Sequence, residues 1–313
     1  MTKDLATHTT ELKLTDPPPP ELAVGADVVL KVAVWCPSGC DLRGLPVTVT
    51  DQDGVLLASG LAAGDCAGGG SAEIALQAPR RLGEFVWTVH GPAHQTAAVR
   101  HEGSTLAIAF RTLPQGTSLA VWDIPSPVVT GARFAIKVGA KSAAGQELRG
   151  ARIEIRDDTG ATVAQSMLGG TPWPDTSALY WTEVELRAPA QEGLGAWRAT
   201  FAASDLELPH DASSSTFSVA VVRPPEHRLT VKVVERETAN PVENAIVRAG
   251  AFRATTDPDG LAQVAMPKGT FDLAIWKVGY EAPVRTVVIE DDMTVEVEVL
   301  TLPDEDPDAV WTM

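Results

Sequence analysis

The chain has 313 residues, with 25 Lys and Arg against 41 Asp and Glu, which gives a formal net charge of −16. This acidic balance argues against non-specific binding to nucleic acids or anionic membranes, which needs a basic face. Hydrophobic residues make up 44% of the chain, enough to bury a core. The length suits two or three domains. No apolar run approaches the length of a membrane span, so membrane insertion is not expected.

The first residues, Met1 to His8, contain no apolar segment like the central region of a signal peptide. The sequence therefore slightly favours a cytoplasmic location. Export in a complex with a signal-bearing partner is the alternative.

Alternation of apolar and polar residues predicts β-strands along nearly the whole chain. Val28, Leu30, Val32 and Val34 show it first, and this period of two places them on one face of a strand. The same period recurs over residues 46–50, 152–156 and 294–299, with Asp- and Gly-rich turns at 51–54, 157–160 and 257–260. No helical period is sustained. The sequence predicts an all-β chain of three tandem immunoglobulin-like β-sandwich domains.

The first two thirds of the chain contain an internal repeat. The segment that begins at Leu42 matches the one that begins at Leu148, at an offset of 106 residues. Later segments match at offsets of 110 and 111 residues, as shown by the pairs Trp87 and Trp197, and Ser104 and Ser215. The change in offset is expected, because insertions accumulate in loops. The matches predict two copies of one sandwich, over residues 1–114 and 115–224.

Residues 225–302 are predicted to form a third, shorter unit after a Pro-rich connector. It contains, in order, Pro241-Val242-Glu243-Asn244-Ala245-Ile246-Val247, Thr255-Thr256-Asp257-Pro258-Asp259-Gly260, Pro267-Lys268-Gly269-Thr270-Phe271 and Gly279-Tyr280. This series resembles the carboxypeptidase regulatory-like domain family, with Phe271 in place of the commoner Tyr. The resemblance implies a transthyretin-like or immunoglobulin-like sandwich. It implies little about activity, because the family is an accessory module found beside many partners.

Four residues are predicted to contact a protein partner: Trp173, Glu296, Glu298 and Trp311. Trp173 lies in a Pro-rich loop, where it is either exposed or plugs a domain junction. Glu296 and Glu298 share one face of the last strand, which suits a basic strand or groove. Trp311 lies in an acidic tail, residues 303–313, read either as a solvated tail or as a docking peptide. Alternatively, this charge serves solubility alone.

Cysteines and histidines gather in the first unit, where Cys36, Cys40, Cys66, His90 and His94 are candidate metal ligands. Thiolates and imidazoles bind zinc and copper. Their spacing matches no known zinc finger, so scattered loop residues are the preferred interpretation, and no cofactor is predicted. A disulfide from Cys66 to Cys36 or Cys40 is the other use of these thiols, and it would leave one of them free.

Three tryptophans, Trp87, Trp197 and Trp276, are predicted to lie in the cores of the three units. No nucleophile motif, metalloprotease motif or phosphate loop occurs, so the chain is not expected to be an enzyme. The sequence predicts an interaction or scaffold protein that binds or spaces a protein partner. A carbohydrate-binding or surface-associated module is one alternative, and a metal-binding protein is the other.

Overall fold

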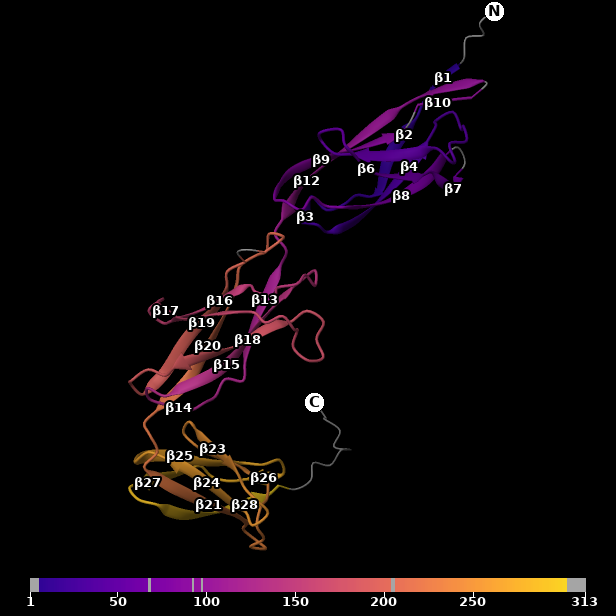
Figure 1. The fold of residues 1–313 in the computed structure, drawn as a ribbon. Coiled ribbons are helices and arrows are strands. Elements are labelled where there is room, and N and C mark those ends of the chain that lie inside the picture. Colours follow the sequence, from indigo (N-terminus) through magenta and orange to yellow (C-terminus); the bar gives the residue numbers. More distant parts are fainter. Residues whose placement is uncertain (1–5, 67–68, 92, 97, 204–205, 303–313) are drawn as a thin grey trace, which may run out of the picture.

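The computed structural model of the chain describes residues 6–66, 69–91, 93–96, 98–203 and 206–302 (Figure 1). Within these ranges every regular element is a β-strand, and no helix is present that could cross a membrane. Figure 1 shows three units that follow one another end to end. The chain is all-β and consists of tandem immunoglobulin-like β-sandwiches, as the alternating pattern predicts.

The first unit has two main sheets, ordered β3-β12-β9-β5-β6 and β2-β4-β8-β7, and a small sheet, β1-β11-β10. Side chains from both main sheets form one buried core. The strand bounds are β1 Ala6–Thr9, β2 Glu11–Asp16, β3 Glu21–Ala23, β4 Asp27–Trp35, β5 Pro46–Thr50, β6 Leu56–Leu61, β7 Ala63–Cys66, β8 Gly69–Gln77, β9 Gly83–Gly91, β10 His94–Gln95, β11 Val99–Glu102 and β12 Ser104–Leu113.

The second unit has sheets ordered β14-β20-β19-β16-β17 and β13-β15-β18, around a second core. These orders match those of β3-β12-β9-β5-β6 and β2-β4-β8 in the first unit. The strand bounds are β13 Thr117–Trp122, β14 Val128–Val129, β15 Arg133–Ser142, β16 Arg152–Asp157, β17 Thr162–Met167, β18 Tyr180–Arg187, β19 Gly193–Phe201 and β20 Ser213–Val222.

Strand register corrects the alignment of the last matching segments. Ile108 pairs with Trp87 in the first unit, and Phe217 pairs with Trp197 in the second. Ile108 and Phe217 therefore occupy equivalent positions, and their numbers differ by 109 rather than by the 111 of the sequence match. The alternating pattern looks alike after a shift of two residues, so pairing across the sheet was needed to place these strands.

The third unit packs two four-stranded sheets, β24-β21-β28-β26 and β23-β22-β25-β27, around a third core. Its first and last strands, β21 and β28, lie side by side in parallel from Leu229 and Met293 onward. The strand bounds are β21 His227–Glu235, β22 Ile246–Ala249, β23 Phe252–Thr255, β24 Leu261–Met266, β25 Gly269–Trp276, β26 Tyr280–Glu281, β27 Arg285–Ile289 and β28 Met293–Thr301.

Two of the three tryptophans predicted for the cores are buried, and one is not. Trp87 and Trp197 are 1% and 5% exposed, and Trp197 stacks on Phe217 with ring centroids 5.6 Å apart. The prediction for Trp276 is wrong, because its side chain is 63% exposed. Strand β25 points Leu273 inward, and the period of two then turns Trp276 to the opposite face.

We expect Trp197→Ala to lower the free energy of unfolding of the second unit by about 3–5 kcal/mol, because it leaves a cavity among aromatic neighbours. Trp276→Ala, the exposed control, should change stability by about 0.5 kcal/mol or less. Differential scanning calorimetry of the full chain measures both. Equal effects of the two substitutions would contradict this assignment of the cores.

Two of the four motifs of the third unit, residues 241–247 and 255–260, meet at one buried hydroxyl. Thr256 is 2% exposed, and its Oγ1 donates to the carbonyl of Val242 at 2.6 Å. The same oxygen accepts the backbone N–H of Ala245 at 2.8 Å. Gly260 has a φ of +73°, and a Cβ there would lie 2.5 Å from the carbonyl oxygen of Val233. Backbone packing therefore explains why Thr and Gly stand at these spacings.

Thr256→Val should cost about 1–3 kcal/mol, because it leaves the Ala245 N–H buried without an acceptor. Thr255→Val is the matched control, because Thr255 directly precedes Thr256 and its side chain is exposed. This substitution should leave the free energy of unfolding nearly unchanged. Urea unfolding monitored by circular dichroism would compare the two. A neutral Thr256→Val would show that the hydroxyl does not hold this loop.

Candidate functional site

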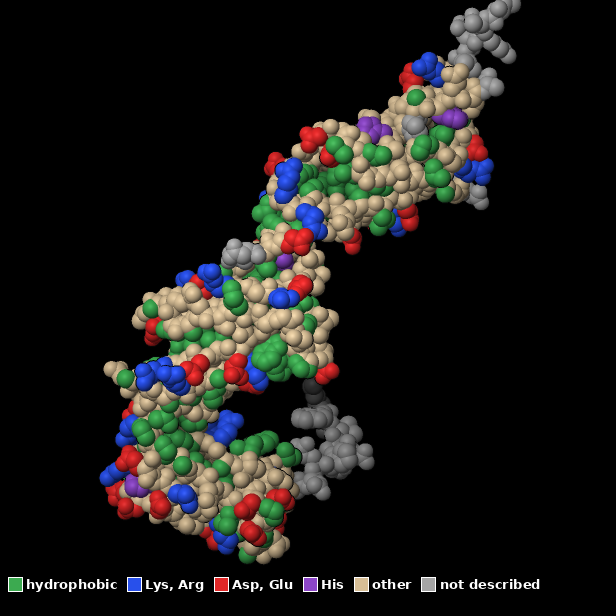
Figure 2. Space-filling view, in the orientation of Figure 1, with side chains coloured by type: hydrophobic (Ala, Val, Ile, Leu, Met, Phe, Trp, Pro, Cys, Tyr) green, Lys and Arg blue, Asp and Glu red, His purple; other side chains and the backbone are tan. Residues whose placement is uncertain are grey.

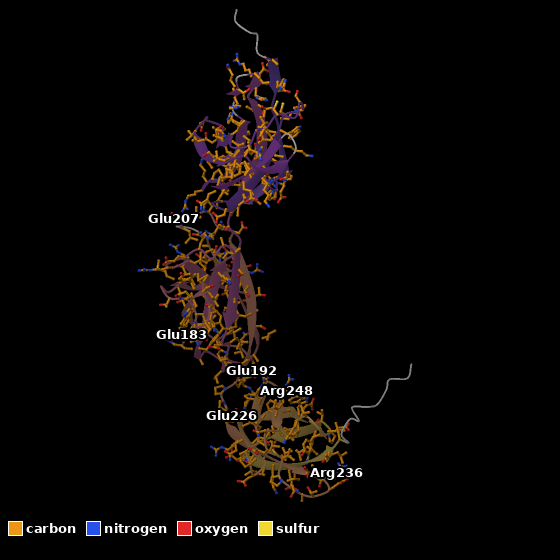
Figure 3. The ribbon with its side chains drawn as sticks, turned by 90° about the vertical axis from the view of Figure 1, so that its right-hand side faces the viewer. Glu183, Glu192, Glu207, Glu226, Arg236 and Arg248 are labelled. Carbon is orange, nitrogen blue, oxygen red and sulfur yellow. The ribbon has the colours of Figure 1, made fainter. Side chains whose placement is uncertain are left out.

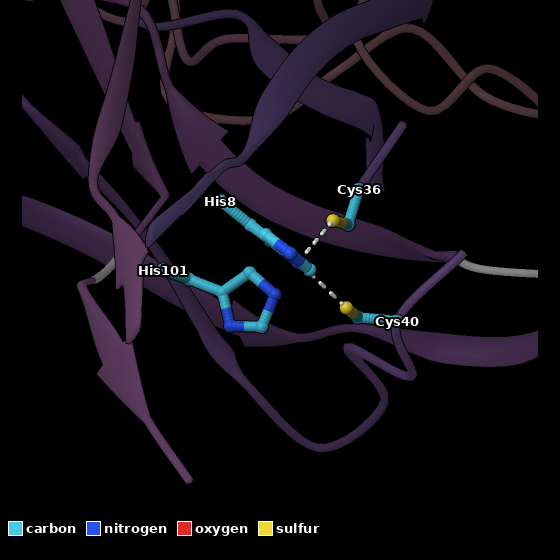
Figure 4. A group of neighbouring side chains, drawn as sticks. All are labelled: His8, Cys36, Cys40 and His101. Carbon is cyan, nitrogen blue, oxygen red and sulfur yellow. Dashed lines mark hydrogen bonds between the residues drawn. The ribbon is translucent and has the colours of Figure 1, made fainter. Parts of the chain in front are cut away.

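Four side chains of the first unit gather in one cluster: His8, Cys36, Cys40 and His101 (Figure 4). One nitrogen or sulfur atom from each lies within 4.8 Å of those of the others. His8 comes from β1, Cys36 directly follows β4, and His101 comes from β11. Three segments that are distant in the sequence thus present two imidazoles and two thiols to one point.

Strand pairing in the small sheet positions the histidines. Strands β1 and β11 are parallel, with His8 opposite His101. Strand β10 runs antiparallel on the other side of β11, with His94 opposite His101. Residues directly opposite in a sheet point to the same face. The two thiols are brought together by a tight turn, in which Gly39 N donates to Cys36 O at 2.9 Å.

The polar atoms of the cluster are incompletely paired. His8 Nδ1 lies 3.2 Å from Cys40 Sγ and 3.8 Å from Cys36 Sγ. His101 is 1% exposed, and neither of its ring nitrogens has a hydrogen-bond partner. Buried polar groups in folded proteins nearly always have partners. The imidazole of His101 is therefore an exception that calls for an explanation.

Burial and neighbouring groups shift the ionisation of this cluster. Burial lowers the pKa of His101, and the nearby His8 and His94 lower it further, so its ring is neutral. Burial raises the pKa of Cys40, and the neighbouring Cys36 adds to this. At Cys36 burial acts in the same direction, but hydrogen bonds from Ser38 and Cys40 outweigh it and hold the pKa below its usual value.

The structure brings together only part of the predicted metal set. Cys36 and Cys40 are in the cluster, and both thiols are free rather than bridged. His94 stacks on His101 with ring centroids 6.2 Å apart. His90 lies elsewhere, with Nε2 2.9 Å from Thr50 Oγ1. The side chain of Cys66 lies outside the described part of the structure.

The other two members, His8 and His101, were missing from the predicted set. His8 lies 28 residues before Cys36, and His101 lies 61 residues after Cys40. Local sequence spacing therefore could not predict that these side chains lie close to the thiols. The parallel register of β1 and β11 is what joins them.

Trp173, a predicted contact residue, lies in a cluster of aromatic rings on the second unit. It is half-buried and does not plug a domain junction. Its ring meets Trp122 edge to face at 5.1 Å and Trp181 at 4.9 Å, centroid to centroid. The ammonium of Lys137 lies 5.0 Å from its ring centroid and 2.5 Å from Asp123 Oδ2. The loop that carries Trp173 thereby covers one sheet with a small aromatic layer.

Trp173→Ala should destabilise the second unit by about 1–3 kcal/mol, because two aromatic pairs worth about 0.5–1.5 kcal/mol each are lost. It should also shift the remaining tryptophan emission to longer wavelength, because Trp122 and Trp181 become more hydrated. Fluorescence-monitored unfolding measures both quantities, with Trp276→Ala as the exposed control. Unchanged stability would mean that the loop does not depend on these ring contacts.

Glu296 and Glu298, the other predicted contact residues, pair within the chain. Lys232 Nζ lies 2.9 Å from Glu296 Oε2, and Arg236 Nε lies 3.3 Å from Glu298 Oε2. Lys232 stands on β21, the parallel neighbour of β28, and Arg236 directly follows β21. Exposed pairs of this kind contribute about 0–1 kcal/mol. Figure 2 likewise shows acidic and basic side chains interspersed on the visible face of this unit. Contact of Glu296 and Glu298 with a partner stays a prediction, and Trp311 lies outside the described residues.

Among the residues that the structure describes, two hydroxyl–imidazole pairs occur, and neither has the arrangement of a Ser-His-Asp triad. In one, Thr50 faces His90, and no carboxylate contacts the second ring nitrogen of His90 among the described residues. In the other, Ser142 lies 3.3 Å from His210 Nε2 but is completely buried. His210 Nδ1 lies 2.8 Å from the carbonyl oxygen of Leu208. A Ser-His-Asp triad requires a nucleophile, a base and a carboxylate oriented toward one another.

No family model matches this chain, and no curated protein matches it in sequence. Among solved structures, it is similar to BcpA, the major pilin subunit of Bacillus cereus, at 9% identity and a TM-score of 0.23, over 93% of this chain and 99% of that one. The Yersinia pseudotuberculosis adhesin InvE aligns at 12% identity and a TM-score of 0.24, over 80% and 66%. Domains 4 and 5 of the S-layer protein SbsC align at 14% identity and a TM-score of 0.25, over 68% and 97%.

Proposed function

We propose that this protein is a non-enzymatic scaffold, a rod of three sandwiches that spaces or holds a protein partner. The observation that carries the proposal is that hydrogen bonds and ion pairs tie successive units together at both junctions. Figure 3 shows Glu207 and Glu192, the acidic members of two of these ion pairs, at the first and the second junction. Domains joined by a flexible linker move independently, whereas domains fixed to one another hold their ends at a set separation.

The first junction is built around Gln115, which lies between β12 and β13 and is 3% exposed. Its Nε2 donates to the carbonyl of Val24 in the first unit at 2.6 Å. Its own backbone bonds to Pro209 and Asp211 in the second unit, both at 2.9 Å. An ion pair between Arg80 and Glu207 spans the same junction. Gln115 therefore bonds to both units at once.

The second junction depends on Arg223, which follows the end of β20. Its Nε lies 2.9 Å from Glu192 Oε1 in the second unit, and its Nη2 donates to the carbonyl of Lys268 in the third unit at 3.0 Å. Two prolines follow and restrict the backbone of the connector. One guanidinium thus binds both units across a short, stiff connection.

We further propose that the third unit is a carboxypeptidase regulatory-like domain that contributes the contact with a partner. The contacts of Thr256 and Gly260 give the motifs of that family a structural reason. The unit also exposes large apolar side chains: Trp276 at 63%, Val278 at 80% and Val284 at 66%. Exposed tryptophan and aliphatic groups of this kind are frequent anchors of protein interfaces.

Small-angle X-ray scattering of the full chain should give the pair-distance distribution of an extended rod with a single preferred length. Arg223→Ala should broaden that distribution, because the guanidinium no longer joins the second and third units. Arg133→Ala is the matched control, because Arg133 pairs with Glu185 inside the second unit, and it should leave the curve unchanged.

Gln115→Ala should loosen the first junction in the same assay, with Gln165→Ala as its control, since Gln165 bonds to Glu154 within one unit. A parent protein that already scatters as a broad ensemble of shapes would refute the rigid scaffold. So would junction variants that behave like their controls.

A further inference from the structure

We infer that His8, Cys36, Cys40 and His101 form a tetrahedral site for a zinc-type divalent cation in the first unit. Two imidazoles and two thiols are the side chains whose nitrogen and sulfur atoms zinc prefers in four-coordinate sites. They converge from three segments, with all four donor atoms within 4.8 Å of one another. This inference stands apart from the scaffold proposal, which rests on the junctions.

The second unit provides an internal comparison, because register identifies its equivalent positions. Leu12 pairs with Val34 in the first unit, and Leu119 pairs with Ala140 in the second. Counting four residues back from each leucine makes His8 equivalent to Gln115. Counting two residues on from Val34 and Ala140 makes Cys36 equivalent to Ser142, and by the same count Cys40 is equivalent to Gln146.

The fourth position follows from the parallel pairing that both units share. His8 pairs with His101, and Gln115 pairs with His210 in the same parallel sense. His101 and His210 are therefore equivalent, and both are buried. The same parallel contact thus occurs in both units, as a four-residue ladder in the first and as one isolated bridge in the second. The side chains at these four positions can therefore be compared directly.

The two imidazoles differ in how their nitrogens are satisfied. In the second unit His210 contacts Ser142 Oγ through Nε2 and the carbonyl of Leu208 through Nδ1. In the first unit both nitrogens of His101 lack a partner, although its side chain is more deeply buried than that of His210. Where the second unit closes its site with hydrogen bonds, the first has thiols and a second imidazole facing an unpartnered ring (Figure 4). A bound cation supplies a partner to one of the two ring nitrogens of His101.

Other unpartnered atoms nearby do not share this explanation. Thr10 and Ser104 have buried hydroxyls without partners, but so do Thr117 and Ser213, their equivalents in the second unit. Those four hydroxyls belong to the fold of both copies. Among the described residues, the ring of His101 differs from these hydroxyls, because its equivalent in the second unit, His210, has partners. This difference points to a ligand at His101.

The donor set selects the cation. Zinc lies about 2.3 Å from sulfur and about 2.0–2.1 Å from nitrogen, which places tetrahedral ligand atoms roughly 3.3–3.8 Å apart. His8 Nδ1 stands 3.2 Å and 3.8 Å from the two sulfurs, so that part of the cluster already has this spacing. Magnesium and calcium require oxygen ligands, and the cluster contains none. Four protein ligands fill the tetrahedron, which makes the site structural rather than catalytic.

Metal-free, reduced, untagged full-length protein is the material for the test. It should take up zinc in a ratio of one ion per chain by mass spectrometry. With Co²⁺ as the probe, the visible spectrum should show tetrahedral ligand-field bands and thiolate-to-metal charge transfer. Magnesium and calcium should not bind. Absence of zinc uptake, or a Co²⁺ spectrum without thiolate bands, would overturn the site. This test uses the unaltered protein, so it does not depend on the folding of any variant.

Variants then assign the ligands. Loss of a residue that only hydrogen-bonds to a metal ligand weakens metal binding by about 10- to 100-fold. Loss of a direct ligand should cost more, so His8→Ala and Cys40→Ser should each weaken zinc binding by more than about 100-fold. His94→Ala is the matched control, because His94 is the other strand neighbour of His101, and it should bind zinc like the parent. Zinc should raise the unfolding temperature of the parent and of His94→Ala, but not of the two ligand variants. A His94→Ala protein that loses zinc while His8→Ala keeps it would refute the proposed ligands.

Discussion

The parallel pairing of each repeat's opening segment with a segment near its end is the constraint on which both the cluster and the first junction depend. In the first unit this pairing joins β1 to β11 and places His8 opposite His101. In the second it joins Gln115 to His210. Parallel pairing requires a long connection between its two segments, and here the sandwich itself is that connection. One backbone arrangement thus holds a set of thiols and imidazoles in one copy and an interdomain contact in the other.

The two copies show how different side chains on equivalent main sheets serve different contacts. The exchange of Cys36 for Ser142 and of His8 for Gln115 leaves strand order unchanged, because neither side chain contributes to the ladder. Each set must still satisfy a buried imidazole, since leaving one unpaired is costly. The second copy does so within the chain, and its glutamine reaches the neighbouring unit as well. Repetition of a fold therefore does not imply repetition of a site.

Fold class followed from the sequence because alternation and turn residues are local signals, and both hold throughout the chain. The burial of Trp87 and Trp197 followed from the same signals. The exposure of Trp276 was not predicted, because the face on which this strand-end residue lies depends on which residues of β25 point inward. Cys36 and Cys40 were visible through their close spacing, whereas His8 and His101 meet only through long-range pairing. The acidic row at Glu296 was predicted correctly to lie on one face. Its cations, on β21 and directly after it, lie about 60 residues away in sequence, so local spacing could not indicate the pairing.

The parallel neighbours β21 and β28 also determine how the third unit resists mechanical load. The chain enters this unit at the start of β21, and the last described strand, β28, runs beside it in register from Leu229 and Met293 to Glu235 and Val299. A pull between the second unit and the end of β28 acts along the two strands in opposite directions. The force is then shared by the whole ladder in shear, because the bonds of a parallel pair are evenly spaced. A hairpin pulled at its open end would instead lose its bonds one at a time.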